Sequence, residues 1–504
     1  MLERLRHPYG VAALLSLLVW LVVAWRSGPP SVRPDDDPLE VFSGARAHAE
    51  LVRLLGDESP HPMGSDANAA VRQRVVGRLR ELGLSPEVQK SWQCNSRGAC
   101  GYVENVVAVI EGGRDAVMLS VHYDSVPAGP GASDDGAGVA ALLEIARALV
   151  DDQSPHNTIV LLVNDGEEVG LLGAKAFMES HPLASRIRAV VNVEARGSRG
   201  ASLMFETSGN SGPLAEHLRA LPRPQTSSLF SAVYEQLPND TDLTVYRQHE
   251  VAGYNFAYIG DVAHYHTPLD DLEHLDRGSL QHHGDNALAL TRSLAAADLN
   301  RLDDEREAVW FDWLGIGVVV WSPATGTFLA VLGTLALVIA GTLLARRERR
   351  RYQRGVLLGA LTMLLLPALT VAGGFVALTL PASRGDARLW WQAFPHLPLF
   401  ALVFVAAGVL LQLSRWLSPF GMWTRFLGVW IVWAPAAIGL ALAFPPASYL
   451  FVLPILAAGS TAAVALALPR RWTSRARRTL VCVPAFVAMV MWTSILLGLG
   501  DAIG

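Results

Sequence analysis

Long apolar runs without charged side chains dominate the C-terminal part of the sequence. The runs cover residues 324–345, 355–380, 397–413, 426–444, 449–468 and 479–499. An α-helix needs about 20 consecutive apolar residues to cross the hydrocarbon core of a bilayer. The sequence therefore predicts an all-α membrane domain over residues 306–504, with about six spans. The short aromatic segment 310–321 before the first run is expected to be interfacial or half-buried.

Another apolar run, Tyr9 to Trp25, lies near the N-terminus. It follows two arginines, and "LVVAWRS" offers no small-x-small cleavage site, which favours a retained anchor over a signal peptide. We expect a transmembrane anchor over residues 1–26 and a Pro- and Asp-rich linker over residues 27–42. Residues 43–305 carry nearly all the Asp and Glu outside that linker, and they are expected to form a soluble domain.

The loops between the apolar runs indicate an orientation. Arg-rich loops at 346–354, 414–425 and 469–478 alternate with loops that are much less basic. Basic loops favour the cytoplasmic side. With the basic N-terminus inside, the soluble domain lies outside the cytoplasm. It would face the periplasm or outer side of a bacterial plasma membrane, or the lumen of a eukaryotic organelle.

Charge also limits the classes of function. None of the apolar runs contains a charged residue, whereas a transporter or proton pump usually needs one. The membrane part is therefore expected to be an anchor or packing platform in contact with lipid. A net charge of −5 argues against a nucleic-acid partner. The sequence does not indicate the oligomeric state.

Two of the three cysteines, Cys94 and Cys100, lie in the polar stretch "WQCNSRGACGY". A local disulfide fits this spacing if the domain is outside the cytoplasm. Two free loop thiols fit it equally well, so both interpretations remain open at this stage.

The soluble domain alternates strand-like and helix-like segments. Strands are expected at 105–112, 116–123, 158–165, 189–195 and 254–260. Helices are expected at 44–55, 68–84, 137–150, 172–180, 211–219 and 278–299. Such alternation predicts an α/β fold, with a mostly parallel central sheet sandwiched by helices.

Side chains that commonly bind metals follow the ends of these strands or precede the helices. They are His122, Asp124, Asp134, Asp135, Glu167, Glu168, Glu194, His264, His266 and Asp270. Each has an ordinary alternative as a surface group or a helix cap. Together they point to one site, because open α/β sheets bind ligands at the carboxyl ends of their strands. Imidazole with carboxylate suits zinc, with cobalt or manganese as alternatives.

The pair Glu167 and Glu168 stands in the stretch "NDGEEVGLLGA". Neighbours in a regular strand point to opposite faces, so a turn is needed for both to serve one site. Gly166 and Gly170 permit such a turn. One glutamate would bind metal, and the other would stay free to take a proton from the metal-activated water.

The motifs "HYDSVPAGPGASDDGAG", "NDGEEVGLLGA", "NVEARG" and "YHTPLDD" resemble those of the dizinc exopeptidases related to leucyl aminopeptidase and glutamate carboxypeptidase II. The sequence is most similar to their membrane-bound branch, the endoplasmic reticulum metallopeptidases and vacuolar membrane proteases. "PNDTDLTVYR" and "RGSLQHHGDNALAL" are also similar to that branch. The resemblance covers roughly residues 43–300 and extends loosely to the multispan tail. It implies a zinc aminopeptidase-like fold and two zinc ions per chain.

The resemblance also implies roles for individual residues. His122 and Glu194 would bind one zinc ion, Glu168 and His266 would bind the other, and Asp134 would bridge them.

Two further roles and a backbone feature follow from the same resemblance. Glu167 would be the general base, and Asp124 would orient the first histidine. The peptide bond between Asp134 and Asp135 would be cis. Many aminopeptidases of the family have Asp where this chain has Glu194, whereas the membrane-bound branch typically has Glu.

The resulting hypothesis is a membrane-anchored zinc metallo-exopeptidase, most simply an aminopeptidase acting on peptides or proteins with a free N-terminus. The alternatives are a glutaminyl cyclase-like acyltransferase of the same fold with one zinc, a non-catalytic binding domain, and a transporter with an accessory domain. Candidates for pocket lining are Tyr234, Asp242, Tyr258 and Tyr265. The preferred substrate residue, and the choice between aminopeptidase, carboxypeptidase and dipeptidase, remain open.

Overall fold

A computed structural model describes residues 28–150, 155–347, 352–365, 422–467 and 480–503, together with Leu18 and residues 21–23 and 25–26. The chain divides into two compact units. One comprises Arg26–Val320, and the other comprises Met1–Trp25 with Trp321–Gly504. Each unit is described by itself.

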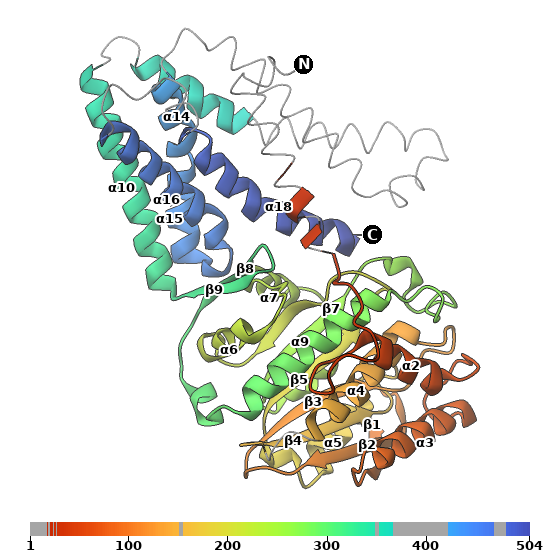
Figure 1. Ribbon diagram of the computed structural model, residues 1–504. Coiled ribbons are helices and arrows are strands. Elements are labelled where there is room, and N and C mark those ends of the chain that lie inside the picture. Colours follow the sequence, from red (N-terminus) through yellow and green to blue (C-terminus); the bar gives the residue numbers. More distant parts are fainter. Residues whose placement is uncertain are drawn as a thin grey trace. The chain divides into compact units, whose positions relative to one another are not determined.

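A seven-stranded sheet forms the centre of the first unit (Figure 1). Its strands are β1 (Glu87–Cys94), β2 (Cys100–Ile110), β3 (Ala116–His122), β4 (Thr158–Asn164), β5 (Ile187–Ala195), β6 (Leu203–Ser208) and β7 (Ala252–Tyr258). They lie in the order β1-β2-β4-β3-β5-β7-β6. The pairings that join β4, β3, β5 and β7 are parallel, as expected. The outer strands β1, β2 and β6 pair antiparallel, so the complete sheet is mixed.

Helices cover both faces of this sheet (Figure 1). On one face lie α2 (Gly44–Leu55), α3 (Asp66–Glu81), α4 (Gly138–Val150) and α9 (Arg277–Ala295). On the other lie α5 (Leu172–Ser180) and α8 (Asp242–Gln248).

The alternation of side chains along β3 explains the two layers. Val117, Leu119 and Val121 belong to the apolar core with α4 and α9, while Met118 packs in a second core with Phe177 of α5. Every residue of β3 is buried, so the strand needs helices on both sides.

Helix ends follow local capping chemistry. The Ser65 side chain accepts a hydrogen bond from the Asn68 backbone N–H group and caps the start of α3. Ser43 begins α2 and Asp276 begins α9 in the same way. These caps fix where each of the three helices starts.

Several elements were not foreseen from sequence. They are β1, β6, α7 (Ser228–Tyr234), α8, and the hairpin of β8 (Val309–Trp313) with β9 (Gly317–Trp321). β1 reads "EVQKSWQC" and exposes part of both faces, so it lacks the apolar run of a central strand. In the hairpin, β8 is largely buried and β9 half-buried, in line with the expected half-buried segment. Cys94 and Cys100 are joined by a disulfide where β1 turns into β2.

From Pro323 onward, the described part of the second unit consists of helices joined by short turns. Its elements are α10 (Pro323–Arg347), a helical stretch at 352–365, α14 (Met422–Ile431), α15 (Trp433–Ala443), α16 (Pro445–Ala467) and α18 (Val483–Ile503). Three helical segments among the described residues are long and apolar enough to cross a membrane: Pro323–Arg346, Met422–Ala443 and Pro445–Ala467.

Small residues bring two of these helices together. A Cβ atom added to Gly459 of α16 would lie 2.5 Å from the carbonyl oxygen of Gly333 in α10, so the backbones are in close contact there. Such contacts are typical of helices that pack inside a bilayer. The predicted span at 397–413 lies outside the described residues, as do most of the anchor at 9–25 and the second half of the span at 355–380.

Candidate metal centre

The carboxyl ends of the parallel strands bring the predicted site residues together. His122 is the last residue of β3, and Glu194 is the penultimate residue of β5. Glu167 and Glu168 follow β4, and His266 follows β7. Asp134 lies in η2 (Ala132–Ala137), the turn that leads into α4. Residues from distant parts of the sequence therefore meet at one edge of the sheet.

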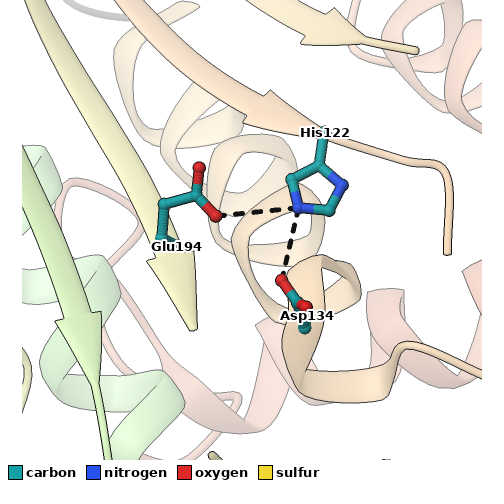
Figure 2. Close-up of side chains that lie close together, drawn as sticks. All are labelled: His122, Asp134 and Glu194. Carbon is teal, nitrogen blue, oxygen red and sulfur yellow. Dashed lines mark hydrogen bonds and ion pairs between the residues drawn. The ribbon is translucent and has the colours of Figure 1, made fainter. Parts of the chain in front are cut away.

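His122, Asp134 and Glu194 form a first group, here called the inner triad (Figure 2). His122 Nε2 lies 3.3 Å from Asp134 Oδ1 and 3.6 Å from Glu194 Oε2. All three residues are buried. Burial alone would lower the pKa of His122, but its carboxylate neighbours raise the pKa well above the usual range. This group can hold a cation through one nitrogen and two oxygen atoms.

Asp134, Glu168 and His266 form a second group, the outer triad. His266 Nε2 lies 3.1 Å from Asp134 Oδ2 and 3.1 Å from Glu168 Oε2. The His266 side chain is 37% exposed, compared with 1% for His122. Tyr265 stacks on the His266 ring at a centroid distance of 3.7 Å. The outer triad therefore stands on loops and reaches solvent.

Asp134 belongs to both triads and directs one carboxylate oxygen to each imidazole. Burial alone would raise its pKa, but hydrogen bonds with the two histidines lower it to about 2. Asp270 holds the Asp134 loop, because its carboxylate accepts the backbone N–H groups of Ser133 at 2.6 Å and Asp134 at 3.2 Å. The Asp134–Asp135 peptide bond is cis, as expected.

The turn with the paired glutamates is held by Asp124. Its carboxylate oxygens accept the backbone N–H groups of Glu167 at 3.1 Å and of Glu168 at 3.2 Å. Its backbone carbonyl oxygen lies 3.0 Å from His122 Nδ1, whereas its carboxylate is 3.5 Å from the same atom. Asp124 therefore joins the first histidine to the glutamate turn, and the closer contact to the imidazole is its carbonyl group.

Glu167 belongs to neither triad. Burial of its carboxyl group away from water, and to a lesser extent repulsion from Glu194, raise the pKa of Glu167 well above the usual range. Loss of water and repulsion from Asp134 raise the pKa of Glu168 to about 7. Glu168 Oε1 is buried without a hydrogen-bond partner among the described residues.

These features fit bound cations. Buried carboxylates in this number repel one another unless positive charge is placed between them. The ligand atoms of each triad lie within 4.8 Å of one another. Imidazole nitrogen with carboxylate oxygen is a donor set that zinc accepts. The residues present can therefore hold two ions that share Asp134.

Three other predicted metal-type residues have different partners. His264 Nδ1 lies 2.7 Å from the Ser198 hydroxyl group, and its ring packs edge-on against His274. The Asp135 carboxylate accepts the backbone N–H groups of His122 and Gly138. Asp270, as described above, holds the Asp134 loop. Asp135 and Asp270 therefore support the site without joining either triad, whereas the contacts of His264 lie elsewhere.

Of the four residues predicted to line a pocket, one contacts a triad residue directly and three have other partners. Tyr265 lies against His266, whereas Tyr258 is fully buried beside His283. Asp242 is buried and accepts a hydrogen bond from Asn164. Tyr234 packs edge-on against Phe205.

Two contacts of the site were missed from sequence. Asn192 Nδ2 donates to Glu194 Oε1 at 3.1 Å, and Asn95 Nδ2 donates to the Val169 carbonyl oxygen at 2.9 Å. Asn192 stands two residues before Glu194 in a strand, hence on the same face, and that spacing was an available signal. Asn95 lies inside the disulfide loop and depends on strand pairing, which the sequence does not reveal.

Comparison with known proteins gives a consistent set of relatives. Residues 105–291 match the model of peptidase family M28. Endoplasmic reticulum metallopeptidase 1 of Mus musculus is 32% identical over 279 residues, which cover 52% of this chain and 31% of that protein. A vacuolar membrane protease of Eremothecium gossypii is 32% identical over 289 residues, which cover 52% and 28%. The chain thus spans about a third of the length of these curated relatives.

Solved structures are similar at a lower level. A glutaminyl cyclase of Porphyromonas gingivalis is 19% identical with a TM-score of 0.42, and the similarity covers 49% of this chain and 97% of that one. A similarity of this size carries no argument about activity.

Proposed function

We propose that this chain, which carries a peptidase family M28 domain, is a membrane-anchored, zinc-dependent exopeptidase that acts as an aminopeptidase on free N-termini. One observation carries the proposal: two potential ligand triads share Asp134, and Glu167, which belongs to neither, is close enough to interact electrostatically with Glu194 and Glu168. A single-ion enzyme would need only one triad.

The proposed ligands are His122, Asp134 and Glu194 for one zinc ion, and Asp134, Glu168 and His266 for the other. When bound, such ions polarise the scissile carbonyl group and lower the pKa of the attacking water.

The chain's own groups would prepare this chemistry. The closeness of His122 Nδ1 to the Asp124 carbonyl oxygen favours the tautomer with a proton on Nδ1. The Nε2 lone pair is then free to face Asp134 and Glu194. The donor atom of the inner imidazole is thus selected by the backbone.

Glu167 is proposed as the general base. Its carboxylate would take a proton from the attacking water and return it to the leaving amine. Burial and the nearby Glu194 carboxylate raise the pKa of Glu167, which favours the protonated form that returns the proton. The Asp124 carboxylate fixes the turn through the amides of Glu167 and Glu168, which keeps the base and the ligand distinct.

The alternative enzyme is a glutaminyl cyclase-like acyltransferase with one zinc ion. Such an enzyme needs only the outer triad. The buried inner triad favours the peptidase, because three converging ligand side chains have no evident use in a one-ion reaction. A non-catalytic binding domain is disfavoured because Glu167 and both triads are present.

Products released from a peptide library with free and blocked N-termini test this proposal. An aminopeptidase removes residues from free N-termini and leaves blocked peptides intact. Release from the C-terminus, or cyclisation of N-terminal glutamine without peptide-bond hydrolysis, would contradict it.

For localisation, we propose a multispan membrane protein with the boundaries 1–26, 27–42, 43–305 and 306–504, and the zinc domain outside the cytoplasm. Arg-rich loops on alternate sides of the apolar runs support this orientation. The Cys94–Cys100 disulfide also supports it, because disulfides persist in oxidising compartments.

Single-cysteine labelling of intact cells tests the orientation. In a chain whose own cysteines are replaced, a cysteine at position 60 should react with an impermeant reagent and one at position 350 should not. The reverse pattern would contradict the proposed topology.

A further inference from the structure

A chain of buried polar side chains crosses the sheet behind the inner triad. It begins at Glu194 in β5 and continues through Asn192 of the same strand. It then passes to Asn255 in β7 and to Glu206 in β6. Asn192 is in register with Asn255, and Asn255 with Glu206, so the three lie directly opposite one another across the sheet.

These side chains lie in the buried interior of the domain. Asn192 and Asn255 are fully buried, and Glu206 is 1% exposed. Val190, two residues before Asn192 in β5 and hence on the same face, belongs to the apolar core with α5 and α8. Burying an amide without a partner costs about 1–3 kcal/mol, so polar groups at such positions need a stabilising arrangement or a function.

The hydrogen bonds fix the donor and acceptor roles along this row of buried polar side chains. Asn192 Nδ2 donates both to Glu194 Oε1 at 3.1 Å and to Asn255 Oδ1 at 3.1 Å. Asn255 Nδ2 donates to Glu206 Oε2 at 3.0 Å and to the Thr241 hydroxyl group at 2.8 Å. A flipped Asn192 amide would place its oxygen against the carboxylate of Glu194. Both amide groups are therefore fixed by acceptors at the two ends.

These hydrogen bonds determine which carboxylate oxygen of Glu194 is available to a metal ion. Its Oε1 is occupied by the Asn192 amide, and its Oε2 faces His122 Nε2 at 3.6 Å (Figure 2). A glutamate has one more rotatable bond than an aspartate, so its carboxylate needs more support to stay in one place. The amide of Asn192 supplies that support through its hydrogen bond to Glu194 Oε1.

We infer that Asn192 is a positioning residue for the metal centre: it holds the Glu194 carboxylate so that a single oxygen, Oε2, is presented to the inner ion. The inference rests on the proposed function, because it assigns zinc to the inner triad. Asn255 and Glu206 fix the amide of Asn192 in turn, and Arg247 of α8 contacts Glu206 at 3.3 Å at the far end.

Zinc titration of the full-length chain in detergent tests this inference. A His266→Ala background disables the outer triad, so that one affinity is measured after the protein is stripped with a chelator. Adding Asn192→Leu keeps the side-chain size and removes the donor. We expect zinc to bind about 10- to 100-fold more weakly, which is the usual effect of removing a residue that hydrogen-bonds a metal ligand. Asn192→Ser, which keeps a hydroxyl donor, should recover part of that loss.

A matched control separates positioning from general stability. Asn157 is also a buried asparagine whose amide donates twice, to the Leu294 and Ala297 carbonyl groups, but it lies at the opposite end of β4 from the site. Asn157→Leu should lower the unfolding temperature and leave zinc affinity within about twofold, since its partners lie away from the metal centre.

A double-mutant cycle tests whether Asn192 acts through Glu194. Glu194→Asp shortens the ligand by one methylene and withdraws it from the Asn192 amide. Adding Asn192→Leu to that variant should then change zinc affinity by less than about threefold, because coupled residues are not additive.

The possible failures are distinguishable. Three results would overturn this inference alone. They are an unchanged zinc affinity in Asn192→Leu, an equal loss of zinc affinity in Asn157→Leu, and an undiminished effect of Asn192→Leu on zinc affinity in the Glu194→Asp background. Absence of zinc binding in the His266→Ala parent would overturn the proposed inner site, and the inference with it.

Discussion

The two triads of the metal centre share Asp134 but differ in their surroundings. The inner triad takes its other ligands from β3 and β5, and its histidine is 1% exposed. The outer triad takes them from loops after β4 and β7, and its histidine is 37% exposed. Strand ends have little freedom, whereas loops can move. For the two ions proposed, we therefore expect the inner one to be held more firmly and the outer one to exchange faster with solvent.

The largest effect is expected at Glu167, the carboxylate outside both triads. Glu167→Gln keeps the shape and removes the base, so kcat should fall by about 10²–10⁴-fold while two zinc ions remain bound. Glu168→Gln is the matched control on the neighbouring ligand and should lower zinc content instead. Elemental analysis with steady-state kinetics would show the two assignments reversed if Glu167→Gln lost the metal.

The two histidines should differ in their effect on the fold. His122→Ala removes one partner from a buried ion pair, which costs about 3–5 kcal/mol of unfolding free energy. His266→Ala removes a partly exposed partner, and the cost should be about 1 kcal/mol or less. Unfolding of the chelator-treated variants measures both values. Equal losses would break the contrast between a buried and an exposed triad.

Graded chelation should remove the two ions in order. The outer ion should leave first, and at least about tenfold faster, because its imidazole reaches solvent. Activity should fall with this first ion. Stopped-flow release into a coloured chelator measures both phases. A single phase that releases both ions together would show that the triads do not differ in accessibility.

Asp124 joins the two sides of the site, so its substitution should affect both moderately. Asp124→Asn places an amide against two backbone N–H donors and should shift the glutamate turn. We expect kcat to fall about 10- to 100-fold, with weaker binding of both ions. A loss confined to the inner ion would restrict Asp124 to orienting His122.

The smallest effect is expected at the disulfide loop, which supports the outer side from a distance. Asn95→Ala removes the hydrogen bond to the Val169 carbonyl group next to Glu168, together with two bonds that Asn95 Oδ1 accepts from backbone N–H groups within its own loop. The bond to Val169 connects this loop to the glutamate turn, and one neutral hydrogen bond contributes about 1 kcal/mol, so activity should fall only about fivefold or less. Gln93→Ala, two residues earlier in β1 and hydrogen-bonded to Glu179, is the control and should leave activity unchanged.

The same contrast shows what the sequence could predict. β3 and β4 are continuous apolar runs buried on both faces, so their positions and the residues at their ends were predictable. All five residues of the two triads were predicted as site residues, because side chains that commonly bind metals follow the ends of the strands or precede a helix. β1 was missed because a polar edge strand has no apolar period.

Contacts that depend on strand pairing were not predictable. Asn192 meets Asn255 only through the register of β5 with β7, and Asn95 meets Val169 only through the hairpin of β1 with β2. His264 has the residue type and position of a ligand, yet its ring bonds to Ser198. Sequence spacing places a residue near the site, but the tertiary structure decides which way its side chain turns.

Metal titration of the chelated full-length chain tests the central claim most directly. Two triads that share Asp134 should bind two zinc ions per chain, and peptide hydrolysis should return with a stoichiometry near two. His122→Ala should reduce the stoichiometry to one and lower hydrolysis strongly. Full peptide hydrolysis with one ion per chain, or one ion in both the natural chain and His122→Ala, would contradict the two-ion account.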